Sequence, residues 1–104
     1  MNLSFFLEQG TEKCFLDEAA KETHIVVYYD LLDKLPKGQD IIASIYETTN
    51  GTKIHNTKFH NRKGKFSFVP HVGGQLKFCY LTGSKGYFYD SEKVRLGIRH
   101  SIGA

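Results

Sequence analysis

The two cysteines have the most distinctive chemistry in this sequence. Cys14 and Cys79 could form one internal disulfide, closing a loop on the order of 65 residues and stabilising the fold by about 4 kcal/mol in the chain-entropy model. A bridge requires their Cα atoms to lie within about 7 Å of each other. The alternative is a pair of buried free thiols, which are common in cytosolic domains. The number of cysteines alone does not decide between these interpretations.

The spacing of the five histidines argues against a role as metal ligands. None of the five forms an i, i+4 helical pair, and the sequence has no Cys-x-x-Cys motif. Catalysis has equally little support, because there is no Gly-x-Ser-x-Gly motif and neither cysteine has a sequence neighbour that would activate it. We therefore predict no metal, no cofactor and no catalytic site. The histidines are His24, His55, His60, His71 and His100.

A basic cluster surrounds a predicted turn in the middle of the chain. Its members are Lys58, Arg62, Lys63 and Lys65, with two phenylalanines nearby. Such a cluster could bind an acidic partner or a phospholipid headgroup, and it could contact single-stranded nucleic acid through stacking and charge. The alternative is a solvated hairpin tip. Arg62 and Lys63 are the candidate partner-binding residues.

Three consecutive aromatic residues form a second candidate surface. Tyr87, Phe88 and Tyr89 follow a glycine-rich segment. Three neighbours in a strand cannot all face one core, so at least one would be exposed and available to a protein partner or a sugar ring. The alternative is packing across the end of a sheet.

Asn50 is a candidate N-glycosylation site, because Asn50-Gly51-Thr52 matches the acceptor tripeptide. The same residues are explained by turn chemistry, since Asn and Gly both tolerate positive φ. Asn50-Gly51 therefore predicts a tight hairpin with a type I′ turn. Asn2-Leu3-Ser4 matches the tripeptide as well.

Length and composition narrow the function classes. The chain has 104 residues, which fits one domain over residues 1–104. Its net charge is +3, and charges of both signs are spread along the chain, unlike those of dedicated nucleic-acid binders. There is no apolar run of about 18 residues that would cross a membrane. Residues 1–4 lack the features of a signal peptide.

Short runs of Val, Ile, Tyr, Phe and Thr separated by Gly, Asn, Asp and Pro are typical of an all-β fold. We predict an antiparallel β-sandwich of about eight strands. Residues 23–32 should form a central strand, and residues 17–22 one helical turn at most. Alternation places Cys79 on the face opposite Leu76, Phe78 and Tyr80. The expected strands cover residues 3–7, 13–16, 23–32, 40–48, 53–59, 65–69 and 75–81, and a last strand contains Val94, Leu96 and Ile98.

The order of these features resembles the GOLD domain of the p24 family, in particular its delta type. The similar segments are Leu3-Ser4-Phe5-Phe6-Leu7, Glu12-Lys13-Cys14-Phe15, Lys63-Gly64-Lys65-Phe66-Ser67-Phe68, Leu76-Lys77-Phe78-Cys79-Tyr80 and Val94-Arg95-Leu96-Gly97-Ile98-Arg99-His100. The resemblance covers nearly the whole chain. It implies a jelly-roll-like sandwich in which Cys14 and Cys79 are joined.

The resemblance also implies a function. Members of this family are type I membrane proteins that cycle between the endoplasmic reticulum and the Golgi. Their luminal GOLD domain is thought to recognise cargo, including GPI-anchored proteins, and to pair with other family members. The signal peptide, coiled coil, membrane span and cytosolic tail would lie outside this sequence.

Two other functions remain open from the residues. A cytosolic GOLD-like module would bind lipid headgroups or protein tails through Arg62 and Lys63, and it would need free thiols. A sugar-binding sandwich would stack Tyr87 or Tyr89 on a sugar ring. An enzyme has the least support.

Overall fold

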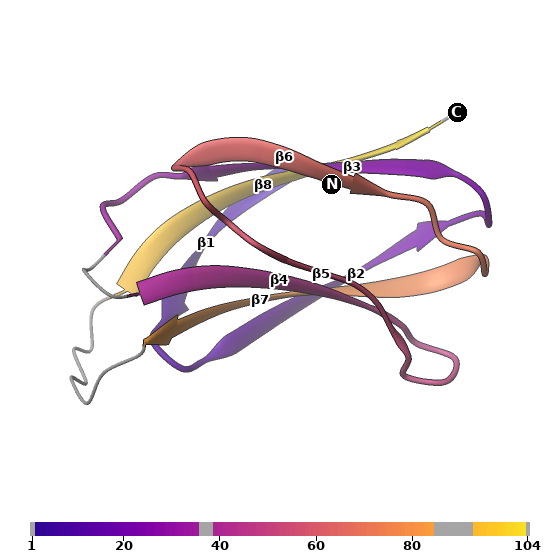
Figure 1. Cartoon of the computed structure of the whole chain (residues 1–104), viewed down its shortest axis with the longest axis horizontal. Coiled ribbons are helices and arrows are strands. Elements are labelled where there is room, and N and C mark those ends of the chain that lie inside the picture. The colour runs from indigo at the N-terminus through magenta and orange to yellow at the C-terminus, as the bar shows by residue number, and fades with distance from the viewer. Residues whose placement is uncertain (1, 36–38, 85–92, 104) are drawn as a thin grey trace.

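The computed structural model describes residues 2–35, 39–84 and 93–103, which form eight strands and no helix. Figure 1 shows two layers, with β3, β6 and β8 above β4 and β7. The predicted all-β antiparallel sandwich is therefore confirmed. The strands are β1 (Asn2–Glu8), β2 (Glu12–Ala19), β3 (His24–Leu31), β4 (Gln39–Glu47), β5 (Lys53–Lys58), β6 (Lys63–Phe68), β7 (Gly74–Ser84) and β8 (Lys93–Gly103).

Each layer is a four-stranded antiparallel sheet. The first sheet has the order β1-β8-β3-β6, and the second has the order β2-β7-β4-β5. This is the strand order of a jelly roll, in which most consecutive strands lie in opposite sheets. Among the strands that the structure describes, only β4 and β5 are neighbours both in sequence and in a sheet. As predicted, β3 is a central strand, flanked by β8 and β6.

The core lies between the inner faces of the two sheets. Alternate residues of each strand point inward, which is why the β8 residues Val94, Leu96 and Ile98 are buried while their neighbours are polar. Phe78 and Tyr80 of β7 are fully buried at its centre. Within the described residues, no helix has the length and apolar character needed to cross a membrane.

The predicted helical turn at residues 17–22 is wrong in its first half. β2 continues to Ala19, with Asp17 opposite Leu76 and Ala19 opposite Gly74. Pairing with β7 satisfies the backbone groups that a helical turn would satisfy locally, so tertiary context overrides the local preference. The chain then turns through residues 20–23, where the Thr23 N–H donates to the Ala20 carbonyl at 3.3 Å.

The hairpin between β4 and β5 is present, but it is not a two-residue type I′ turn. The strands are joined by residues 48–52, and Gly51 is the residue of this loop with positive φ, at 73°. The Asn50 side-chain oxygen accepts a hydrogen bond of 3.0 Å from the Thr52 N–H. The backbone closes the longer loop, because the Gly51 N–H donates to the Glu47 carbonyl and the Glu47 N–H to the Thr52 carbonyl, each at 2.9 Å.

Candidate binding surface

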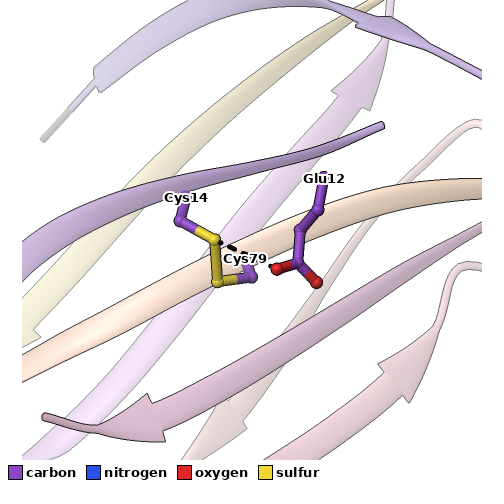
Figure 2. Close-up of side chains that lie close together, drawn as sticks. All are labelled: Glu12, Cys14 and Cys79. Carbon is purple, nitrogen blue, oxygen red and sulfur yellow. Dashed lines mark hydrogen bonds between the residues drawn. A yellow bond between two sulfur atoms is a disulfide. The ribbon is translucent and has the colours of Figure 1, made fainter. Parts of the chain in front are cut away.

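The disulfide joins two neighbouring strands, near the start of β2 and at the middle of β7. Cys14 of β2 lies directly opposite Cys79 of β7, with a Cα–Cα distance of 4.1 Å and an S–S distance of 2.09 Å (Figure 2). Both lie on the outer face of the second sheet, so the predicted orientation of Cys79 away from the core is confirmed. Cys79 is nevertheless buried, at 1% exposure. Neither sulfur is free, which excludes the interpretation as two free thiols.

A polar row extends from the disulfide across the second sheet. Cys79 pairs with Ser44 of β4, and Ser44 pairs with Asn56 of β5. The Asn56 side-chain N–H donates to the Ser44 hydroxyl at 2.9 Å. This row of side chains crosses all four strands, with a covalent bond between β2 and β7 and a side-chain hydrogen bond between β4 and β5.

Among the described residues, Glu12, Cys14 and Cys79 form the one group with the spacing of metal ligands. The Glu12 carboxylate oxygen lies 3.4 Å from the Cys14 sulfur (Figure 2). Both sulfurs are already bonded to each other, and metals bind the thiolate form of cysteine. A single carboxylate remains, which is not a metal centre.

The basic cluster predicted around residues 58–65 is divided by the fold. Lys58 faces outward on the second sheet and forms an ion pair with Asp40 at 3.4 Å. The Arg62 guanidinium donates to the Leu31 carbonyl at 3.4 Å, at the end of β3. Lys63 belongs to β6, and it faces outward on the first sheet with Lys65. β6 therefore begins at Lys63, earlier than the start expected at residue 65.

The outer face of the first sheet carries a groove of about 690 Å³, here called the outer groove. Two lysines of the predicted basic cluster, Lys63 and Lys65, line this groove. It also contains Tyr28, Asp30 and Arg99. The Arg99 guanidinium carbon lies 4.0 Å from the centre of the Tyr28 ring, which is a cation–π contact.

Sequence reasoning missed the residues that shape this groove. Tyr28 and Arg99 are opposite each other in the register between β3 and β8, and Lys65 is opposite Tyr28 in β6. Nothing local in the sequence brings them together. The available signal was the polar face of the last strand, where Gly97 stands between Arg95 and Arg99.

His100 takes part in a polar network between the two sheets. Its Nε2 lies 3.0 Å from the Tyr80 hydroxyl, and its Nδ1 lies 3.2 Å from an Asp17 carboxylate oxygen. Burial lowers the pKa of His100 below its ordinary value of 6.5, and this outweighs the opposite effect of Asp17. Burial also raises the pKa of Tyr80. The network links β8 to β2 and β7 inside the core.

Two further predicted sites have different outcomes. Tyr87, Phe88 and Tyr89 lie outside the described residues, so their role stays a prediction. Asn50 is exposed in the β4–β5 loop, where its side chain completes the turn. Its glycosylation also stays a prediction.

The chain matches one protein family over nearly all of its described residues. The family model described as emp24/gp25L/p24 family/GOLD matches residues 2–102. The matched region contains both cysteines and all the residues of the outer groove.

Curated proteins similar to the chain carry one printed name, "Transmembrane emp24 domain-containing protein eca". Those of Drosophila sechellia, Drosophila simulans and Drosophila melanogaster are each 26% identical to it over 105 residues. The alignment covers 93% of this chain and 49% of each relative. The chain thus spans about half the length of the curated relatives it matches.

Proposed function

Because the chain belongs to the emp24/gp25L/p24 GOLD family, we propose that it is the luminal, cargo-recognising domain of a p24-type receptor in transport between endoplasmic reticulum and Golgi. The observation that carries the proposal is the family match over residues 2–102. The Cys14–Cys79 bridge supports it, because disulfides persist in oxidising compartments such as the lumen of the secretory pathway.

The full-length protein is a type I membrane protein in this proposal. Residues 1–104 form its single GOLD domain, and the membrane span, coiled coil and cytosolic tail belong to segments outside this sequence. The curated relatives, which are about twice as long and are named transmembrane proteins, support that arrangement. Its cargo includes GPI-anchored proteins. Assignment to the delta type stays a prediction.

The domain has a binding role and no enzymatic one in this proposal. Among the described residues, two histidines contact a carboxylate: exposed His71 contacts Glu22, and buried His100 contacts Asp17 and also Tyr80. A general base must reach its substrate within hydrogen-bond distance. His100 instead uses both ring nitrogens inside the fold, which supports a structural role.

Pairing with another GOLD domain is the second part of the proposal, and the edge strand β1 is the surface that supports it. An edge strand offers unpaired backbone groups to another chain, and charged side chains normally protect such edges. Among the residues of β1, Glu8 is the only charged one. Phe6 in the same strand is 50% exposed. β2, β5 and β6, the other edge strands, each carry at least two charges.

Sedimentation of the purified domain tests the pairing. We expect reversible association at hundreds of micromolar, weakened by Phe6→Lys. Leu16→Lys is the matched control, because Leu16 lies on edge strand β2 with a similar exposure of 52%. A domain that stays monomeric throughout this range would contradict pairing through the domain alone.

Cargo recognition is tested in cells with the full-length protein. Its removal should retain GPI-anchored proteins in the endoplasmic reticulum, and re-expression should restore their transport.

The disulfide weakens the alternative of a cytosolic module that binds lipid headgroups or protein tails, which needs free thiols. The sugar-binding alternative depends on Tyr87 and Tyr89, outside the described residues.

A further inference from the structure

We propose that the outer groove binds an extended acidic segment of a partner protein. The inference rests on the proposed function only where it identifies that partner as cargo or receptor. The binding itself follows from the shape and charge of the groove.

The floor of the groove is made of short side chains. Ser4 of β1, Gly97 of β8 and Asp30 of β3 stand opposite one another in register and form one row across three strands. A Cβ atom on Gly97 would lie 3.6 Å from the Asp30 carbonyl oxygen and 3.7 Å from a Leu32 methyl group. Both are ordinary contact distances, so the space above Gly97 is a hollow that a side chain would fill.

The adjacent row provides a wall of larger side chains. Asn2, Arg99, Tyr28 and Lys65 stand opposite one another in β1, β8, β3 and β6. The Arg99 guanidinium carbon lies 4.0 Å from the centre of the Tyr28 ring, a contact that favours one position of its planar set of N–H donors. A pre-oriented guanidinium is well suited to a carboxylate, because two parallel hydrogen bonds can form.

The charge of the groove favours an acidic ligand. Lys63, Lys65 and Arg99 are its cations, and Asp30 is its acidic residue. Within the part of the chain that the structure describes, the ion pairs use Lys58, His71, Lys93 and His100, so none of the three groove cations is neutralised in this way. Their positive potential would attract carboxylates.

The Asp30 carboxylate makes an acidic peptide a better ligand for the groove than an anionic lipid surface. A carboxylate in the floor repels a phosphate group placed above it. A peptide can offer a backbone N–H to Asp30 and direct its own carboxylates to Arg99 and Lys65. The groove crosses four strands, about 14 Å at the usual strand spacing, which matches an extended segment of about four residues.

Fluorescence anisotropy with the purified domain tests the proposal directly. The probe is a labelled octapeptide of alternating Glu and Val, and its comparison peptide has Gln in place of Glu. We expect saturable binding of the Glu peptide, with an affinity that falls as salt rises. Equal binding of the two peptides, or no binding of the Glu peptide at millimolar domain, would overturn the proposal.

Gly97→Val fills the floor of the groove without changing any charge. We expect it to weaken binding by about tenfold or more, the effect of losing one well-placed charge-assisted contact. Gly103→Val is the matched control, because Gly103 lies on the same face of β8 and a Cβ there meets nothing within 4 Å. Unchanged affinity in Gly97→Val, with thermal unfolding showing a folded domain, would contradict binding in the groove.

Charge variants give an independent test if Gly97→Val unfolds. Lys65→Gln should lower the affinity for the Glu peptide several-fold. Lys77→Gln, on the outer face of the second sheet, should leave that affinity unchanged. Equal losses in the two variants would indicate non-specific charge attraction and overturn the proposal. Binding to phosphatidylserine vesicles that is lost in Lys65→Gln, without any peptide binding, would assign the face to lipid instead.

These outcomes are separable from the proposed function. If the peptide does not bind but full-length protein still restores transport, the groove proposal fails and the function stands. If the peptide binds but removal of the protein leaves transport unchanged, the function fails and the groove remains a peptide site.

Discussion

His100 and Tyr80 share a hydrogen bond of 3.0 Å across the interior of the sandwich, although they belong to different sheets. A neutral imidazole satisfies both of its partners there. Its Nδ1–H donates to Asp17, and its Nε2 accepts from the Tyr80 hydroxyl. Protonation would place a second N–H against that hydroxyl and a charge inside the core.

Stability is predicted to fall as the pH drops below about 6.5. The unfolded chain binds a proton at His100 with its ordinary pKa of 6.5, whereas burial lowers the folded pKa, so acidification favours unfolding. Burial lowers the pKa of His55 as well, so protonation of His55 at low pH also favours the unfolded chain. The slope contributed by one histidine is at most about 1.4 kcal/mol per pH unit. Urea unfolding between pH 5 and pH 8 measures it.

His100→Gln should flatten this pH dependence, even though it lowers stability at every pH. His24→Gln, an exposed histidine at the start of β3, is the control for removing an imidazole. A slope that is the same in His100→Gln and in the unaltered protein would show that His100 does not carry the effect.

Loss of the disulfide is predicted to cost about 4 kcal/mol, because the bridge closes a loop of 65 residues. The measurement is denaturant unfolding of the oxidised protein and of the Cys14→Ser, Cys79→Ala double variant. The pair keeps Cys79 apolar, since that side chain is 1% exposed. A difference below about 1 kcal/mol would mean that the unfolded chain is already compact in this loop.

Gly64→Ala is predicted to destabilise the fold by about 1–3 kcal/mol through overpacking. A Cβ on Gly64 would lie 2.6 Å from the Tyr29 hydroxyl and 2.8 Å from the ring carbon that bears it. The Tyr29 ring cannot easily move away, because it stacks on Phe59 with a centroid distance of 3.7 Å. Gly103→Ala is the control, and thermal unfolding is the measurement. Equal melting temperatures would show that Tyr29 shifts without cost.

Asn50→Ala is predicted to lower stability by about 0.5–1 kcal/mol, because it removes the acceptor for the Thr52 N–H in an exposed turn. Asn50→Asp keeps an oxygen at the same place and should retain most of the stability. Chemical denaturation of both variants checks this, and identical losses would assign the effect to something other than the hydrogen bond.

The local alternation of apolar and polar residues was enough to predict where the strands lie and which of their faces is buried. Alternation in the last strand separates buried Val94 and Leu96 from their polar neighbours, and the structure agrees. The segment at Asp17–Ala19 was misjudged because its partner, β7, is about 60 residues away in sequence.

The outer groove could not be predicted from local sequence patterns, because its residues are also far apart in the sequence. Its Lys65, Tyr28 and Arg99 come from β6, β3 and β8, and only the sheet register places them in one row. A jelly roll sends most consecutive strands to opposite sheets, so sequence order does not reveal which strands are neighbours.

The central position of β8 has a mechanical consequence. β1 and β3 flank it and pair antiparallel with it, from Lys93 to Arg99 on one side and from Leu96 to Gly103 on the other. Ladder hydrogen bonds of antiparallel strands are perpendicular to the strands. Tension applied at Gly103 along β8 would load these two ladders together in shear, so the strand would resist a pull where an edge strand would peel away one bond at a time.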